Sequence, residues 1–469
     1  RALKGNSVVA LAADQAVRTG VPVRFFGRLV PAPAGPVTIA ARLGSTVLPV
    51  FDVREKGKYH RVHVLSALDL HAGLGGTVDE AGAMQKYYDL LEDFIRRYPD
   101  QWLWEHKRWK YTRTKTMLIL TDGKAGHEAQ SKTVADLFEE IRREDPSYEF
   151  RIKTVQVVYR SSGHRAMLTV LAPFLRPWIR GRIGMLRHFL TEACFAELGP
   201  KYADFVISCG SGLVPVNLLV ATENHAKSIV LMKPSFPFRR ASFDLVLAPR
   251  HDEPARGKEV IYTDTALNPV EPVLLAREAR KLAGRLRLNG HQVLSVFIGG
   301  DTRRYALSEE KLGKALARIF EIAKGAHAHV LVTTSRRTRP ELARALRDKF
   351  AGEGTCRLFL IASEGNIPNV TYGMIGLGHA LFVTEDSLSM VSEAASSGKK
   401  VVVLRVGNGA LPAKHERFHE NLAAKRIVTV ARAEEITGNL LSDACQSEPA
   451  QQALDAARAA IKAKLIKML

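Results

Sequence analysis

Residues 369–393 read NVTYGMIGLGHALFVTEDSLSMVSE, and this stretch decides the fold class. The apolar run 380–383 predicts a buried strand, and the residues from Leu388 onward predict a helix. Four polar residues, 384–387, stand between the two elements. A strand that leads through a short polar loop into a helix is the repeating unit of a doubly wound α/β sheet.

The same alternation extends to both sides of this stretch. Beyond residue 291 the apolar pattern predicts strands over residues 293–298, 330–334, 357–361, 380–384 and 400–404, with helices between them. An earlier series predicts strands over residues 117–120, 203–208, 228–232 and 245–248. Two successive series predict two Rossmann-like lobes that face each other across a cleft. We place a front lobe at 114–285, a rear lobe at 286–445 and a C-terminal helix within 446–469.

The loop 122–130 (DGKAGHEAQ) follows the first strand of the front lobe. In open α/β sheets ligands bind at the carboxyl ends of the strands, where such loops lie. His127 is the candidate general base for an acceptor hydroxyl, because imidazole titrates near neutrality. The alternative is that His127 only lines the start of a helix. The other candidate residues of this loop are Asp122, Gly123, Gly126 and Gln130.

The segment 299–305 (GGDTRRY) has the same position in the rear lobe. The backbone amides of Gly299, Gly300 and Asp301 are candidates to receive a diphosphate. Arg303, or the adjacent arginine, would neutralise the charge. The alternative is that the glycines serve only a tight turn from strand to helix.

A third loop crowds small polar side chains onto the start of a helix, where free N–H groups attract phosphate. Glu393, further along that helix, is a candidate to accept hydrogen bonds from a ribose or sugar diol. A capping box would explain one of the serines but not the whole set. The candidate donor-binding residues here are Thr384, Asp386, Ser387, Ser389 and Ser392.

Residues 116 to about 440 resemble the bacterial family named after the plant mitochondrial fission protein of the ELM type, described as glycosyltransferases of the GT-B type. The segments that carry the resemblance are 122–130, 297–305 and 369–393. It implies a GT-B-like pair of Rossmann-type lobes that needs no metal or other cofactor. It also implies a nucleotide-sugar donor bound by the rear lobe through Thr384, Ser387, Ser389 and Glu393.

Glu385 and Glu393 also have the E-x7-E spacing of some retaining glycosyltransferases. Two glutamates at this spacing occur easily by chance, so the match is weak.

Residues 1–113 form a separate α/β segment before the front lobe. Apolar runs predict strands at Ser7–Ala13, Thr46–Val53 and Tyr59–Val64, and a helix at Asp79–Tyr98. The segment ends in PDQWLWEHKRWK at 99–110. Without a relative for comparison, its tryptophans and cations indicate an amphipathic interfacial helix.

Residues 1–112 resemble the C-terminal portion of bacterial lipid A biosynthesis (lauroyl) acyltransferases, above all through 99–110. The resemblance implies a partial α/β acyltransferase domain in which Asp14, Arg54 and the Arg108/Lys110 pair line the site. The family's H-x-x-x-x-D/E motif lies upstream of the matched region, so this segment is not expected to transfer acyl groups alone. Because Arg1 stands inside what looks like running sequence, we expect the natural start further upstream.

The formal net charge is +20, which favours anionic partners; a generally basic proteome is the alternative. No apolar run is long enough to span a bilayer. The four cysteines have neither metal-ligand nor disulfide spacing, so we expect a reducing compartment and no metal site.

Residues 151–190 contain eight Arg or Lys and no Asp or Glu. Apolar residues between Met167 and Ile179 form a helical face that includes Trp178, beside Arg176, Arg180 and Arg182. This pattern predicts docking on an anionic lipid surface. The alternative is a helix pair packed on the sheet with solvated arginines.

Together these observations predict sugar transfer from a nucleotide-sugar donor to a glycolipid or lipopolysaccharide acceptor. The protein would lie peripherally at the cytoplasmic face of the bacterial inner membrane. Two other functions remain open: an acyltransferase with an accessory GT-B part, and a non-catalytic membrane-associated scaffold. A nucleic-acid partner is not expected, since no aromatic-basic module of known spacing occurs.

Overall fold

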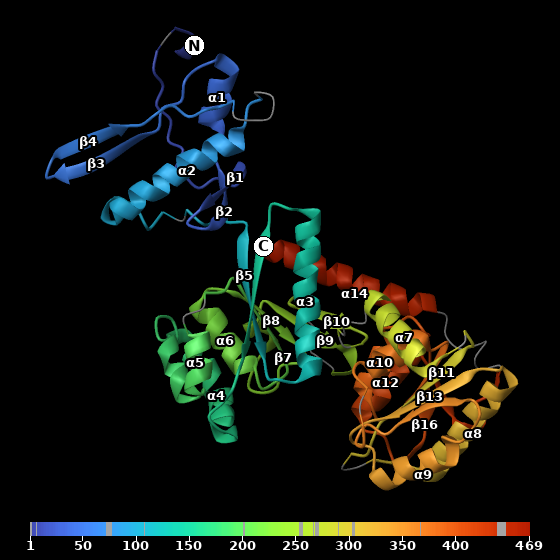
Figure 1. The fold of residues 1–469 in the computed structure, drawn as a ribbon. Helices are drawn as coiled ribbons and strands as arrows, with labels where there is room; N and C mark the ends of the chain where they lie inside the picture. Colours follow the sequence, from blue (N-terminus) through green and yellow to red (C-terminus); the bar gives the residue numbers. More distant parts are fainter. Residues whose placement is uncertain are drawn as a thin grey trace. The chain divides into compact units, whose positions relative to one another are not determined.

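The structure is a computed structural model (Figure 1), and it describes residues 2–5, 7–71, 77–106, 108–199, 202–252, 257–265, 267, 272–288, 290–302, 305–365, 367–438 and 447–469. The chain divides into two compact units. Unit 1 comprises Arg1–Met117 and Phe138–Lys153, and unit 2 comprises Leu118–Leu137 and Thr154–Leu469. These units do not correspond to the predicted lobes, so the predicted domain limits stay predictions.

Unit 1 contains two antiparallel hairpins and a long amphipathic helix. Its elements are η1 (Leu3–Gly5), β1 (Val21–Phe25), β2 (Arg28–Ala32), α1 (Gly35–Leu43), β3 (Val50–Lys56), β4 (Tyr59–Val64), α2 (Glu80–Arg97) and η3 (Pro99–Gln101). The side chain of Asp79 accepts a hydrogen bond from the Gly82 amide at 2.8 Å, which caps α2. The core of this unit lies between α2 and the β1–β2 hairpin.

The core of unit 1 includes a buried cation. Arg108 is 1% exposed, donates to the Tyr88 hydroxyl and lies 5.6 Å from the centre of the Phe25 ring. The Tyr88 hydroxyl in turn donates to the Ala13 carbonyl oxygen at 2.9 Å. The tryptophan-rich segment 99–110 therefore contributes to the core as well as to the surface.

Two strand predictions in unit 1 need correction. The strand predicted at Ser7–Ala13 is wrong, because these residues form no strand and Val8 is 97% exposed. An apolar run becomes a strand only where a neighbouring strand satisfies its backbone groups, and no described strand pairs with this one. The strand predicted from Thr46 begins later, at Val50, directly after Pro49, which lacks an N–H group.

The front lobe is a six-stranded sheet with the order β10-β9-β8-β7-β5-β6. Sequence analysis found β5 and β7 to β9 but not β6 and β10. The elements are β5 (Thr114–Thr121), α3 (Ala125–Glu144), β6 (Glu149–Gln156), α4 (Ser162–Leu175), η4 (Arg176–Trp178), η5 (Ile183–His188), α5 (Glu192–Leu198), β7 (Phe205–Cys209), α6 (Val214–Glu223), β8 (Lys227–Leu231), η6 (Arg240–Ser242), β9 (Leu245–Pro249), η7 (Arg250–Asp252) and β10 (Val260–Thr263).

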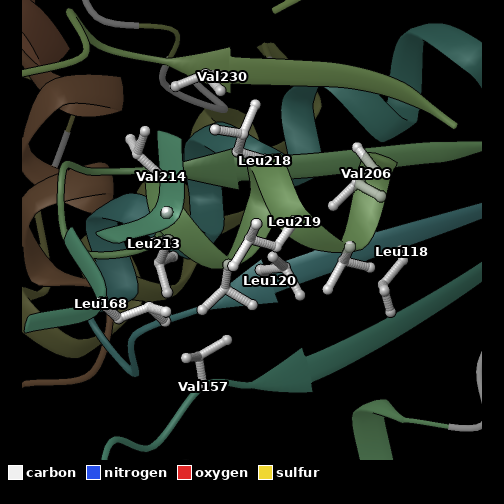
Figure 2. Close-up of a cluster of buried hydrophobic side chains, with 14 of the residues drawn as sticks. Leu118, Leu120, Val157, Leu168, Val206, Leu213, Val214, Leu218, Leu219 and Val230 are labelled. Atoms are coloured by element: carbon white, nitrogen blue, oxygen red, sulfur yellow. The ribbon is translucent and has the colours of Figure 1, made fainter. Parts of the chain in front are cut away.

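Figure 2 shows the core on one face of the front sheet. Leu118 and Leu120 of β5, two residues apart, both face this cluster because strand side chains alternate between faces. Leu168 of α4 and Leu218 of α6 complete it from the helices. One side of α4 is thereby fixed against the sheet.

The rear lobe is a second six-stranded sheet with the order β14-β13-β11-β15-β16-β18, and all its pairs are parallel. The predicted strands 293–298 and 380–384 are confirmed with the same bounds. The elements are α7 (Pro272–Leu286), β11 (Val293–Ile298), β12 (Ala306–Leu307), α8 (Glu309–Gly325), β13 (His329–Thr334), α9 (Pro340–Phe350), β14 (Cys356–Leu360), α10 (Val370–Leu377), β15 (Ala380–Thr384), α11 (Leu388–Ala395), β16 (Lys400–Arg405), β17 (Gly407–Asn408), α12 (Ala413–Ala424), β18 (Thr429–Arg432), η8 (Ala433–Glu435) and α14 (Ser447–Met468).

Both faces of the rear sheet are covered, so its strands are apolar on both sides. Leu294, Val296 and Ile298 of β11 pack under α8 and α9. Val293 and Phe297 of the same strand pack under α7, α10, α11 and α12. Helices on both faces of a parallel sheet confirm the predicted α/β class with two Rossmann-type lobes.

Candidate functional site

The strand orders place the predicted site loops at defined positions. In the rear sheet the order reverses at β11, whose neighbours are β13 and β15. In the front sheet it reverses at β5, whose neighbours are β6 and β7. Ligands of open α/β sheets bind at such switch points, beyond the carboxyl ends of the strands. The loops after β5 and β7 therefore form the candidate site of the front lobe, and the loops after β11 and β15 form that of the rear lobe.

An aspartate and a histidine form a pair after β5. The Nδ1 atom of His127 lies 3.1 Å from each carboxylate oxygen of Asp122. Helix α3 begins at Ala125, so His127 lies in its first turn. Both side chains are about one fifth exposed, so a ligand can reach them. With Nδ1 held by the carboxylate, Nε2 is the ring nitrogen that remains to accept a proton.

Neighbouring groups stabilise the ionised form of Asp122. Burial would raise the pKa of this carboxyl group, but the hydrogen bond from Lys124 and the proximity of His127 outweigh it and hold the pKa below its ordinary value. The Lys124 Nζ atom lies 3.0 Å from Asp122 Oδ2. Asp122 is therefore ionised at neutral pH and can stabilise a protonated imidazole.

Gly210, directly after β7, shapes the space beside His127. Its φ angle is +98°, in the region that favours glycine, and an added Cβ would lie 2.6 Å from the His127 Cε1 atom. Gly123 also has a positive φ, of 77°. Among the other candidates, Gly126 lies in the first turn of α3 with open space around it, and Gln130 is partly buried on the same helix.

The two rear-lobe glycines donate their amides within the protein. The Gly299 amide donates to Thr384 Oγ1 at 2.8 Å, and the Gly300 amide donates to Asp386 Oδ2 at 2.7 Å. An added Cβ on Gly299 would lie 2.1 Å from Asp386. Glycine is thus required here for close approach of the β11 and β15 loops. Phosphate contact by these two amides stays a prediction and would require Thr384 and Asp386 to release them.

Asp386 connects the loops of the rear site. Its side chain is fully buried, accepts from Thr384 Oγ1 at 2.7 Å, and lies 3.9 Å from the exposed Arg337 guanidinium. Burial raises the pKa of Asp386 above its ordinary value despite these partners. The His415 ring Nε2 lies 3.2 Å from the Asp386 carbonyl oxygen.

Arg337 was not found from sequence, although a signal was present. It belongs to Ser335–Arg339 (SRRTR), which follows β13 directly at the same edge of the sheet. Arg303 lies outside the described residues. Arg337 is therefore a described cation beside Asp386 that is exposed and near the switch point.

Asp301 and Glu385 take part in structural networks. Asp301 accepts from the Leu307 amide at 2.8 Å and pairs with Arg339 at 2.6 Å. Glu385 accepts from the Tyr305 hydroxyl at 2.6 Å and from Arg405 at 3.0 Å. Glu385 therefore connects the turn after β11 to β16. Glu393, the other glutamate of the E-x7-E spacing, takes no part in this network.

The start of α11 carries the predicted serines. Ser387 is the N-cap residue, its Oγ accepts from the Met390 amide at 3.4 Å, and it lies 3.5 Å from the Ser389 hydroxyl. Ser389 is exposed, whereas Ser392 is buried. Capping of α11 thus accounts for Ser387. Ser389 is exposed in the first turn of the same helix.

Glu393 lies on α11 in an apolar environment. Burial raises the pKa of Glu393 to about 7, from an ordinary value of 4.5. Part of the residue remains accessible to solvent. A carboxyl group with a pKa raised to near neutrality is a functional-site candidate.

In unit 1 the predicted acyltransferase residues occupy different surroundings. Asp14 lines a pocket of about 290 Å³ together with Phe51, Tyr87 and Trp102. Arg54 is exposed, and its backbone exchanges two hydrogen bonds with the Gln101 side chain. Arg108 is part of the core described above.

Within the described ranges, no three or more His, Cys, Asp or Glu side chains are grouped to hold a metal ion. No helix in those ranges has the length and apolar character needed to cross a bilayer.

Comparison with known proteins matches two parts of the chain to two different families. Residues 125–464 match the family described as "Mitochondrial fission ELM1", and residues 1–111 match "Bacterial lipid A biosynthesis acyltransferase". The mitochondrial fission protein ELM1 of Arabidopsis thaliana is 24% identical over 287 residues, which cover 55% of this chain and 62% of the plant protein. An uncharacterized protein of Rickettsia prowazekii is 25% identical over 259 residues, or 48% of this chain and 71% of that protein.

The phosphatidylinositol mannoside acyltransferase of Mycobacterium tuberculosis is 33% identical over 108 residues, which cover 23% of this chain. The chain thus spans 32% of the length of that protein. Among solved structures, MurG of Acinetobacter baumannii has a TM-score of 0.40 at 13% identity and covers 76% of this chain and 100% of its own. A Listeria monocytogenes protein described as a UDP-N-acetylglucosamine 2-epimerase has a TM-score of 0.41 at 12% identity, covering 74% and 91%.

Proposed function

The chain belongs to the family described as Mitochondrial fission ELM1, and we propose that it transfers a sugar from a nucleotide-sugar to a hydroxyl group of a cell-envelope glycolipid or lipopolysaccharide. We place this activity at the cytoplasmic face of the bacterial inner membrane, with the protein bound peripherally. The proposal rests on the residues at the two switch points.

The observation that carries the proposal is the Asp122–His127 pair. A base that deprotonates an acceptor hydroxyl needs an accessible ring nitrogen and a group that orients the ring. Asp122 accepts from Nδ1 at 3.1 Å, and the loop stands at the carboxyl end of β5. This is the geometry expected of a general base rather than of a histidine that only begins a helix.

In the proposed step, His127 acts as the general base for the acceptor hydroxyl. The acceptor hydroxyl oxygen forms a bond to the anomeric carbon of the sugar, and its proton passes to His127 Nε2. The bond from that carbon to the diphosphate oxygen breaks, and the nucleoside diphosphate leaves. Asp122 stabilises the imidazolium that forms, and no redox change or metal is involved.

The donor side would combine a helix start with a cation. Ser387 and Ser389 lie at the first turn of α11, where backbone N–H groups and hydroxyls suit a phosphate. Arg337 lies next to Asp386 and would neutralise the departing diphosphate. Glu393, a partly buried residue of α11, would accept hydrogen bonds from a ribose or sugar diol.

A lipid acceptor is supported by two observations. Residues 1–111 match a lipid A biosynthesis acyltransferase family, so the same chain carries a segment related to enzymes that act on lipids. Helix α4 also exposes a row of apolar side chains: Met167, Val170, Leu171 and Phe174, continued by Trp178. A row of this kind beside arginines suits a membrane surface.

Calorimetric titration of the full chain with UDP-, GDP-, ADP- and CMP-sugars tests the proposal. We expect one nucleotide class to bind with a Kd within about 1 μM to 1 mM. Ser387→Ala/Ser389→Ala and Arg337→Gln should each weaken that binding about tenfold. His127→Ala should bind the donor normally and lose transfer to an envelope lipid extract. If no nucleotide-sugar binds the folded wild-type chain, the proposal falls and a scaffold role takes its place.

The family match of residues 1–111 favours a second candidate function, acyl transfer. In that case the GT-B part would be accessory. Its test is acyl transfer to a lipid acceptor by the full chain, with and without the His127→Ala substitution.

A further inference from the structure

A pocket of about 570 Å³ lies on the front lobe, away from the candidate site. It is formed between η4, the end of α6 and the start of β8, and its lining includes Arg176, Arg180, His225 and Ser242. These elements meet at the amino ends of the parallel strands. Asp122 and His127 follow the carboxyl end of β5, so the pocket is separate from the proposed catalytic residues.

The pocket is cationic. Arg176 and Arg180 are both exposed, and in the part of the chain that the structure describes neither guanidinium has an acceptor. The one acid in the lining, Asp244, is already compensated: Lys227 Nζ lies 3.0 Å from Oδ1, and the Ser228 amide donates to Oδ2 at 3.0 Å.

Another acid near the pocket is also engaged. Glu223, at the end of α6, accepts from the Gly181 amide at 2.9 Å, which fixes the turn after Arg180. Apart from the two arginines, Asp244 and His225, the lining residues carry no ionisable side chain. Two guanidinium groups that converge on one opening fit a phosphate group, which accepts paired N–H donors.

Exposed apolar side chains of α4 and η4 lie close in the sequence to the two arginines of this pocket. Figure 2 shows Leu168 pointing into the core, and Ile179 is also fully buried, which fixes the orientation of α4 and η4. On the other side Phe174 is 70% and Trp178 66% exposed, and these residues flank Arg176 in the sequence. Figure 1 shows α4 on the outside of the front lobe beside α5 and α6.

We propose that this pocket binds the phosphate headgroup of an anionic phospholipid through Arg176 and Arg180, while Phe174 and Trp178 insert among the acyl chains. The two pocket arginines without an acceptor and the exposed apolar side chains near them in the sequence favour a lipid over a free phosphate compound, which would use only the pocket. The inference deepens the membrane location in the proposed function. It makes the pocket an anchor rather than an acceptor site, because it opens at the other edge of the sheet.

The test is flotation of the full chain with vesicles, without any nucleotide-sugar. One vesicle type contains phosphatidylcholine only, and the other contains one part phosphatidylglycerol to two parts phosphatidylcholine. We expect binding to the second type, weakened by salt, and at least about tenfold loss for Arg176→Gln/Arg180→Gln. Phe174→Ser/Trp178→Ser should weaken binding by a similar factor.

The matched control is Arg280→Gln/Arg285→Gln, which removes the same charge from exposed positions on α7. Its binding should stay within about twofold of wild type. Equal losses in the two arginine pairs would mean general charge attraction and would overturn the pocket proposal. Glycerol phosphate that displaces the protein only in large excess supports a lipid, whereas full displacement near equal concentration overturns the lipid assignment.

Circular dichroism and donor titration of each variant separate this result from folding and from the proposed function. Folded variants that bind donor normally but not vesicles support the anchor. If the wild-type chain binds no nucleotide-sugar and still binds anionic vesicles through these residues, the transferase proposal fails and the anchor stands.

Discussion

His127 and Asp122 share a hydrogen bond in which the ring Nδ1 lies 3.1 Å from both carboxylate oxygens. The bond selects the tautomer that protonates Nδ1 and leaves Nε2 as the acceptor. The positions five residues apart are brought together by the turn from β5 into α3.

Substitution of Asp122 by Asn should lower kcat for sugar transfer by about 10²–10⁴-fold, because an amide neither fixes the tautomer nor stabilises the imidazolium. His127→Ala should reduce kcat as much, and the double variant should be no worse than either single one. The measurement is release of the nucleoside diphosphate in the presence of acceptor. Additive losses in the double variant would argue against a shared role of the two residues.

Gly210→Ala should displace the His127 ring. The new Cβ would lie 2.6 Å from Cε1 and the residue would keep a φ of +98°, which costs roughly 1–2 kcal/mol for a non-glycine residue. Gly290→Ala is the control, because it has a φ of +74° and no atom within 4 Å of the added Cβ. Both variants should lose similar stability in urea, and only Gly210→Ala should lose transfer activity. Equal transfer activity of the two variants would show that Gly210 does not control the position of the His127 ring.

Glu393 should make the stability depend on pH. Its pKa is raised to about 7 in the folded chain, so the folded state holds the proton to higher pH than the unfolded chain, in which the pKa is 4.5. The free energy of unfolding therefore falls as pH rises from 4.5 to 7. Glu393→Gln removes this dependence and should be about 1–3 kcal/mol more stable than wild type at pH 8, with little difference at pH 4.5. Urea unfolding at both values measures it, and an equal stability change at both would contradict the assignment.

His419 should have the opposite dependence. Its side chain is fully buried, neither ring nitrogen has a hydrogen-bond partner among the described residues, and burial lowers its pKa to about 3. The unfolded chain binds a proton below pH 6.5 and the folded chain does not, so stability falls as pH drops from 6.5 toward 3. His419→Leu should remove about 2 kcal/mol of the loss between pH 6.5 and 5. Thermal unfolding of both proteins across this range tests it; parallel curves would show that another group dominates.

Much of the α/β fold followed from the order of residues. The apolar runs at 293–298 and 380–384 predicted strands that the structure contains with the same bounds. A central parallel strand is buried on both faces, so its composition alone marks it. Strands β6 and β10 escaped detection, since most residues of β6 are exposed. The apolar run Ser7–Ala13 shows the converse, because it lacks a partner strand.

The site was predictable only in part. The positions of His127 and Ser387 followed from their places after strands and at helix starts, which is local information. The engagement of the Gly299 and Gly300 amides by Thr384 and Asp386 could not be predicted, since the partners lie 85 and 86 residues away. Arg337 enters the same site because β13 lies beside β11.

By itself, the sequence determined most of the strands of the two lobes and which loops carry polar side chains, because these depend on short-range periodicity and on the residue types at the ends of elements. Only the tertiary structure decided which of those loops meet, which amides are already engaged, and that Arg176 and Arg180 converge on one pocket. These are relations between residues distant in the chain, and they exist only once strand order and helix packing bring the residues to the same edge of a sheet.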